Sequence, residues 1–143
     1  MRALLLLSLL LLFLLTVPAE YLGDLSENKL NPDSIFNDLG AYGALSPTSP
    51  RNSIDLYGSP VSPYSATNPL AMDAPRLYDQ EGNYRGKLST NTLDPDSVSN
   101  PLGRYGSSLS PDSLKNPLGA GNPLDPGSPK NRYGRGWRIE GGQ

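Results

Sequence analysis

The stretch DPDSVSNPLG, residues 94–103, contains the pattern that decides the fold. Asp is followed by Pro, by Ser two residues after the Pro, by Asn three residues after the Ser, and by an apolar residue two further on. Six copies of this motif occur, each beginning with Asn, Ser or Asp, and their prolines are Pro32, Pro47, Pro63, Pro95, Pro111 and Pro126. The interval from Pro63 to Pro95 is twice as long as the others, so it holds two repeat lengths.

The motif copies lie within a longer duplication. The segment 21–28 (YLGDLSEN) aligns with 84–91 (YRGKLSTN), and the same offset relates Pro32 to Pro95. The pattern is compatible with a solenoid and with two small lobes. The domain boundaries that we predict are a signal peptide at 1–19, a first repeat half at 20–72, a connector at 73–83, a second repeat half at 84–139 and a tail at 140–143.

Each motif copy is predicted to begin a single turn of helix. Asn, Ser and Asp are strong N-cap residues, and Pro fits the first helical position, where no backbone N–H is needed. The serine three residues after the cap resembles the partner in a capping box, with its hydroxyl reaching back toward the cap. Glycines three residues after the motif asparagine are suited to left-handed C-terminal caps, namely Gly40, Gly103, Gly119 and Gly134.

The apolar position of the motif is expected to form the core. It is occupied in all six copies, by Leu39, Ile54, Leu70, Leu102, Leu118 and Tyr133. Ile35, Val98 and Leu114 lie four residues before three of them, on the same face of a helical turn. We predict that stacked turns pool these side chains into a shared interior, because one short repeat cannot bury such a face alone.

Short strands are expected to join the turns. Residues 41–45 and 104–109 have an extended character, and the connector is typical of a hairpin, with strands at 77–79 and 84–88 around a turn at 80–83. The expected fold class is a small, irregular, β-rich repeat protein. In it, short strands and hairpins alternate with single-turn capped helices, and little regular helix follows the signal peptide.

Residues 1–19 have the features of a secretory signal peptide. Arg2 gives a positive start, residues 3–15 are apolar apart from Ser8, and Val17-Pro18-Ala19 predicts cleavage after Ala19. Retention as an N-terminal anchor is the alternative, although the apolar run is shorter than a membrane span, which needs about 20 residues. We expect a secreted or periplasmic protein without a membrane span once the signal is removed.

Composition limits how the exported part folds and what it binds. The chain has no Cys, so no disulfide supports its core. Leu, Ile, Val and Phe make up only roughly a sixth of residues 20–143, so a chain that folds only on binding a partner is an alternative. The net charge of −2 predicts no general affinity for nucleic acid.

The repeated segments resemble a family of small secreted bacterial repeat proteins. The residues that carry the resemblance are Tyr-x-Gly-x-Leu-Ser-x-Asn, then Pro-Asp-Ser-x-x-Asn-Pro-Leu-Gly-Arg-Tyr-Gly-Ser and Ser-Pro-Asp-Ser, and they span nearly all of 21–139. The resemblance implies export and a repeat architecture, and it supplies no catalytic residue. The first half departs from the pattern at Asp38, Ser53 and Asp55, which predicts less regular repeats there.

The sequence offers little that supports catalysis. Without His, a serine–histidine nucleophile is excluded, and without Cys or His so is a zinc site built from those residues. Asp79 and Glu81, beside the only segment that interrupts the repeat, are the best candidates for a carboxylate pair. A calcium site at 79–83 is a further alternative to a polar hairpin turn, but the segment lacks the spacing of an EF-hand loop. No cofactor is expected.

Aromatic and basic residues supply a possible binding surface. Tyr42 and Tyr105 occupy equivalent positions and are suited either to burial or to recognition. The segment 130–138 is suited either to a final strand and tail or to contact with an anionic surface. The candidate binding residues are Tyr42, Tyr105, Tyr133, Trp137, Arg135 and Arg138.

These observations predict an exported, non-enzymatic repeat module that binds an envelope component, a glycan or a protein partner. A carboxylate-dependent hydrolase acting on envelope glycans, with Asp79 and Glu81 as its pair, is the alternative.

Overall fold

A short antiparallel sheet organises the protein. The computed structural model describes residues 19–142, so the predicted signal peptide lies outside the described residues except for Ala19. The strands are β1 (Glu20–Leu25), β2 (Arg76–Tyr78), β3 (Tyr84–Lys87) and β4 (Trp137–Gly141), in the order β1-β4-β2-β3. The hairpin predicted for the connector is confirmed, because β2 and β3 pair directly.

The core lies at the centre of this sheet. Leu77 on β2 is opposite Ile139 on β4, and both side chains are fully buried. Around them lie the other members of the core cluster, namely Leu22, Leu25, Ile35, Tyr57 and Trp137. The strand order is unchanged when β1 is exchanged with β3 and β2 with β4. In this sheet β1 and β3 therefore hold equivalent edge positions, and β2 and β4 hold equivalent central positions.

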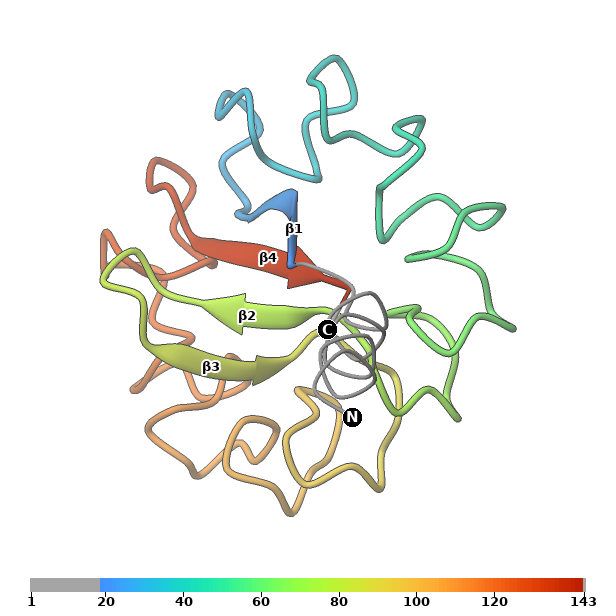
Figure 1. Cartoon of the computed structure of the whole chain (residues 1–143). Helices are drawn as coiled ribbons and strands as arrows, with labels where there is room; N and C mark the ends of the chain where they lie inside the picture. The colour runs from blue at the N-terminus through green and yellow to red at the C-terminus, as the bar shows by residue number, and fades with distance from the viewer. Residues whose placement is uncertain (1–18, 143) are drawn as a thin grey trace, which may run out of the picture.

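Two long segments without regular strands complete the structure. The first arc, residues 26–75, joins β1 to β2, and the second arc, residues 88–136, joins β3 to β4. Each arc curves around one side of the sheet, and together they give a nearly circular outline (Figure 1). No helix lies within residues 19–142, so the predicted single-turn helices are wrong, as are the strands predicted at 41–45 and 104–109.

The arcs are built from β-turns that follow one another every three residues. The backbone N–H of Asn31 donates to the carbonyl of Asn28, that of Ser34 to Asn31, and that of Asn37 to Ser34. The same spacing continues through most of both arcs. Each hydrogen bond spans three residues, as in a β-turn, and the residue that accepts it opens the turn.

Side chains of the opening residues explain why turns form here rather than helices. The Oδ1 atom of Asn31 accepts from the backbone N–H of Asp33 at 2.9 Å, and the Oγ atom of Ser34 accepts from that of Phe36 at 3.1 Å. Such local bonds offer the backbone an alternative to a helix. Pro at the second position has the φ angle that the turn requires.

The motif serine and asparagine each make a further contact. The six motif serines are buried, and Ser34 donates its hydroxyl to the carbonyl of Ser26 at 2.6 Å. The capping-box prediction is therefore wrong, because this hydroxyl points inward rather than back to the cap. In five of the six motif copies the asparagine Nδ2 donates to the carbonyl six residues earlier. This bond links the turn that the asparagine opens to the second turn before it.

The motif glycines are needed for space rather than for a left-handed backbone. Gly40, Gly103, Gly119 and Gly134 have no positive φ, so the predicted left-handed caps are wrong. A Cβ atom on Gly40 would lie 2.6 Å from the carbonyl oxygen of Pro32, closer than real Cβ contacts. The glycine therefore lets two turns approach each other.

The apolar residues of the motif do not form the core. Leu39 is 100% exposed and Leu102 and Leu118 are each 93% exposed, and the other three members of the set, Ile54, Leu70 and Tyr133, are exposed as well. The prediction of a shared interior is wrong for these six positions. They are the third residues of the turns that the motif asparagines open, and in these turns the second and third side chains point outward. Ile35 is buried and Val98 and Leu114 are half-buried against the core, because they follow a buried serine.

Candidate binding surface

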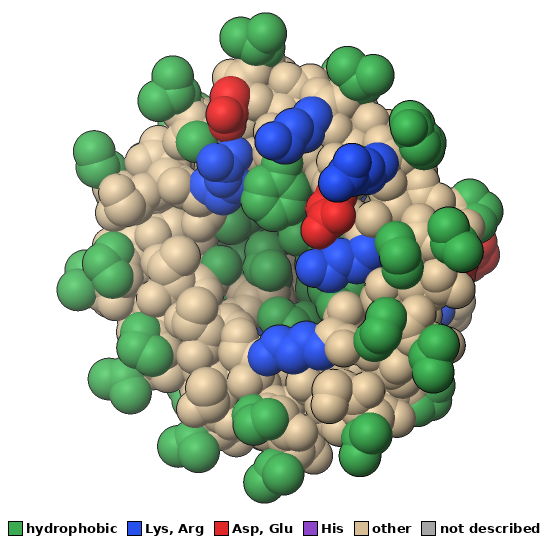
Figure 2. Space-filling view, turned by 180° about the vertical axis from the view of Figure 1, so that it is seen from behind, with side chains coloured by type: hydrophobic (Ala, Val, Ile, Leu, Met, Phe, Trp, Pro, Cys, Tyr) green, Lys and Arg blue, Asp and Glu red, His purple; other side chains and the backbone are tan. Residues whose placement is uncertain are grey.

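Exposed apolar side chains cover the rim of the protein. They stand out as separate protrusions around the whole outline (Figure 2). Most are the third residue of a turn opened by Asn or by a small residue, and they include Leu30, Leu39, Leu45, Ile54, Val61, Leu70, Leu93, Leu102, Leu109, Leu118, Leu124 and Tyr133. A single exposed apolar side chain is ordinary in a soluble protein, but here such side chains recur at the same position of successive turns.

The proposed carboxylate pair is divided between two environments. Asp79 is buried, and its Oδ2 accepts from Arg85 Nη2 at 2.8 Å and from Asn83 Nδ2 at 3.1 Å. Its Oδ1 accepts from the backbone N–H groups of Glu81 and Asn83. Glu81 is exposed. The Asp79 carboxylate is thus occupied by donors from its own hairpin, which suits a structural role.

Replacing Asp79 with Asn should destabilise the protein by about 1–3 kcal/mol at pH 7, because Arg85 and Asn83 lose their acceptor. Burial by itself would raise the pKa of Asp79, but hydrogen bonds from Asn83 and the charge of Arg85 hold it below its ordinary value. This stabilisation is present above the unfolded pKa of about 3.9 and is lost as pH falls through the folded pKa. Urea unfolding at several pH values measures it.

The difference between Asp79→Asn and the parent protein should shrink as the solution becomes acidic. Glu81→Gln is the matched control, and it should leave the free energy of unfolding unchanged because Glu81 is exposed. Equal losses in the two variants would contradict the structural role of Asp79.

The four candidate tyrosine and tryptophan residues do not share one surface. Tyr105 and Trp137 are buried, so their rings pack inside the protein, whereas Tyr133 is exposed. Tyr42 is half-buried and packs edge-on against Tyr21 with ring centroids 5.1 Å apart, as Tyr105 does against Tyr84 at 5.6 Å.

Tyr21 and the candidate arginines lie around the buried carboxylate of Asp24. Burial and a 2.7 Å hydrogen bond from its hydroxyl to Asp24 Oδ1 raise the pKa of Tyr21. Arg135 Nε lies 3.6 Å from Asp24 Oδ2, and the Arg138 guanidinium lies 5.2 Å from the centroid of the Tyr21 ring. Both arginines are exposed at the surface while these contacts hold them.

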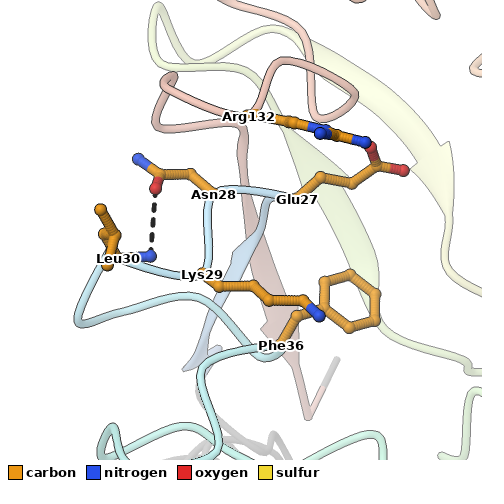
Figure 3. A pocket seen from close by; sticks show the side chains of 6 residues that line it. All are labelled: Glu27, Asn28, Lys29, Leu30, Phe36 and Arg132. Atoms are coloured by element: carbon orange, nitrogen blue, oxygen red, sulfur yellow. Dashed lines mark hydrogen bonds between the residues drawn. The ribbon is translucent and has the colours of Figure 1, made fainter.

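Two open hollows lie side by side where the first arc begins and the second arc ends. The larger, of about 610 Å³, is lined by Glu27, Asn28, Lys29, Leu30, Phe36 and Arg132. In Figure 3 the side chains of Glu27, Lys29, Phe36 and Arg132 extend to one side, and those of Asn28 and Leu30 extend to the other. The smaller, of about 370 Å³, shares Glu27 and Arg132 and adds Lys130, Leu124 and Tyr133 among its lining. Lys and Arg side chains gather around a hollow on the face shown in Figure 2.

Sequence reasoning included Arg132 in a basic tail but did not single out Lys29, Leu30 and Phe36. These three residues lie near the opposite end of the described chain from Arg132. A usable signal was present in the three-residue spacing of Asn, Ser, Asp and Gly, which begins at Asn28. That spacing would have placed Lys29 and Leu30 in the outward positions of the first turn.

Neither a membrane-spanning helix nor a cluster of metal-ligating side chains lies within the described residues. No helix within residues 19–142 has the length and apolar character needed to cross a bilayer. In the same residues no three His, Cys, Asp or Glu side chains gather closely enough to hold a metal ion. No protein-family model, curated protein or solved structure matches this chain.

Proposed function

We propose that this chain is an exported, non-enzymatic repeat module that acts by binding through the apolar side chains on its rim. The exposed third residue of the motif turns is the observation that carries the proposal. Leu102 and its equivalents contribute nothing to the core, and a polar residue in such a turn would be better solvated. A retained apolar residue in all six motif copies is therefore best accounted for by contact with a partner.

In this proposal the repeating unit is one three-residue turn. Five three-residue turns separate Pro32 from Pro47 and Pro111 from Pro126, and each 16-residue interval contains one turn that is a residue longer. The duplicated halves each contribute one arc. In the turns that the motif asparagines open, the asparagine side chain makes the inward contacts in five of six copies, and the second and third side chains are exposed. A scaffold of this kind presents a long surface to a partner.

The partner in this proposal is an envelope component, a glycan or another protein in the secreted or periplasmic space. Export is supported by the apolar segment before Ala19. A carboxylate-dependent hydrolase is less well supported, because Asp79 is held by Arg85 and Asn83. Folding only on binding is also less well supported, since a closed network of hydrogen bonds satisfies the buried polar side chains within residues 19–142.

Replacing Leu102, Leu118 and Leu124 together with Ser should weaken binding while leaving the protein folded. All three are the last residue of an Asn-Pro-Leu turn, and the loss follows from removing apolar contact area. Retention of the exported protein on peptidoglycan, on envelope polysaccharide and on lipid vesicles measures the effect.

The matched control for this triple variant replaces neighbouring polar residues of the rim, Ser53, Thr92 and Ser108, with Ala. These side chains occupy the second position of rim turns, so the control should be retained like the parent protein. If the Leu→Ser variant were retained as strongly as the parent protein on every probe that the parent binds, binding through the rim would be contradicted. Retention of the parent on none of them would count against binding itself.

A further inference from the structure

The two arcs meet at two junctions that share the same hydrogen bonds to backbone carbonyls. At the first junction, Glu27 N–H donates to the Pro129 carbonyl at 2.8 Å and Asn28 Nδ2 donates to the Gly134 carbonyl at 3.2 Å. At the second junction, Thr90 N–H donates to the Ala66 carbonyl at 3.0 Å and Asn91 Nδ2 donates to the Ala71 carbonyl at 3.3 Å. The offset of the sequence duplication relates every one of these atom pairs to its counterpart in the other junction.

The junctions also present matching apolar side chains. Leu30 and Leu93 are each 87% exposed, and Leu124 and its counterpart Val61 are 85% and 84% exposed. Tyr133 at the first junction corresponds to Leu70 at the second, and both are exposed. The apolar rim therefore does not distinguish the two junctions.

Charge does distinguish them. The first junction has Lys29, Lys130 and Arg132, whose counterparts at the second are Thr92, Thr67 and Pro69. Glu27, its one carboxylate among these positions, corresponds to Thr90, and the exposed ring of Phe36 corresponds to Ser99. Since the second junction forms the same hydrogen bonds without any of these groups, the fold does not require them.

The cations of the first junction are only partly neutralised. Lys130 lies 3.5 Å from Glu27, while Lys29 and Arg132 have no ion-pair partner within residues 19–142. This excess of positive charge lies in a chain whose overall charge is −2, so it is local rather than general. Leu30 and Phe36 line one of the open hollows at the same place, and Leu124 lines the other.

We infer that the first junction docks onto an anionic phospholipid surface. Cations beside protruding Leu and Tyr side chains match such a surface, because the headgroups attract the charges while the apolar side chains enter the interface. A soluble anionic polysaccharide would satisfy Lys29 and Arg132 but would leave Leu30 and Leu124 in water. The separate protrusions also suit a fluid bilayer better than a protein, which would need a matching pocket for each. The inference rests on the proposed binding function and names its partner.

Binding of the exported protein to vesicles of phosphatidylglycerol and of phosphatidylcholine tests this inference. The parent protein should prefer phosphatidylglycerol. The double variant Lys29→Thr with Arg132→Pro copies the second junction. It should bind phosphatidylglycerol about twenty-five-fold more weakly, or about fivefold for each charge removed. A charge-matched control, Lys115→Gln with Arg104→Gln, should change it little. Leu124→Ser should weaken it, whereas Val61→Ser at the counterpart position should not. Thermal unfolding checks that each variant is folded.

Equal binding to the two kinds of vesicle would overturn the inference, as would an equal loss in the charge-matched control. Dextran sulfate serves as a soluble polyanion in a parallel measurement. The protein could instead bind dextran sulfate through Lys29 and Arg132 and fail to bind vesicles. That result would also overturn the proposal that its partner is a lipid surface. That outcome would leave the proposed binding function standing, whereas failure on every probe would remove both.

Discussion

Replacing Gly86 with Ala should destabilise the protein by about 4 kcal/mol, enough to unfold a marginal domain. Gly86 has φ +93°, a conformation that L side chains rarely adopt. A Cβ atom there would lie 2.7 Å from the carbonyl oxygen of Asp96 and 2.7 Å from Cγ of Tyr105. Both neighbours belong to the contact by which β3 holds the second arc, so neither is free to move. Urea unfolding measures the loss.

Gly82 is the matched control for this substitution. Its φ is +87°, but no atom lies within 4 Å of the position that a Cβ would take. Gly82→Ala should therefore lose only about 1–2 kcal/mol, the cost of the backbone conformation alone. Equal losses at Gly82 and Gly86 would show that the second arc does not press against β3 as the structure has it.

Leu77→Ala should destabilise the protein by about 2–5 kcal/mol, because it opens a cavity at the centre of the sheet. Leu77 is fully buried opposite Ile139, at the point where the two halves of the sheet meet. The core is small, so few neighbours are available to fill the space. Thermal or urea unfolding of the protein measures the change.

Leu102→Ala is the control that separates the core from the rim. Leu102 is almost fully exposed, so this variant should stay within about 0.5 kcal/mol of the parent protein. A large loss at Leu102 would restore the interpretation in which the motif leucines form the interior. A small loss at Leu77 would contradict the core that the sheet defines.

The connector shows where the sequence was sufficient. Apolar residues alternate on either side of a short polar turn there, and β2 and β3 pair as this local pattern predicts. The residue types of the motif also predicted the right kind of contact, because the side-chain oxygens of Asn31 and Ser34 do accept backbone N–H groups.

Single helical turns were predicted wrongly because the repeat was taken to be the distance between motif prolines rather than three residues. The motif was interpreted at the spacing of its prolines, where Pro at a first helical position suggests a helix that stops at once. In the structure Ser34 and Asn37 each open a new turn, three residues apart. Helical caps and turn openings use the same side chains, so residue type alone did not separate them.

The sequence predicted only part of the candidate binding surface. Tyr133 and the basic residues at the end of the second arc were singled out, but Lys29 and Phe36 were not. They approach Arg132 because the arcs close around the sheet, and such closure depends on contacts distant in the chain.

The sequence by itself determined the local conformation. Asn, Ser or Asp followed by Pro makes a turn wherever it occurs, because the side-chain oxygen and the pyrrolidine ring act within a few residues. Only the tertiary structure decided which residues are inside. The arcs close around β4 and β2, and this closure directs each buried serine toward the sheet and each Asn-Pro-Leu leucine toward solvent. Direction relative to a core is a property of the closed ring, so a pattern of apolar residues along the chain did not contain it.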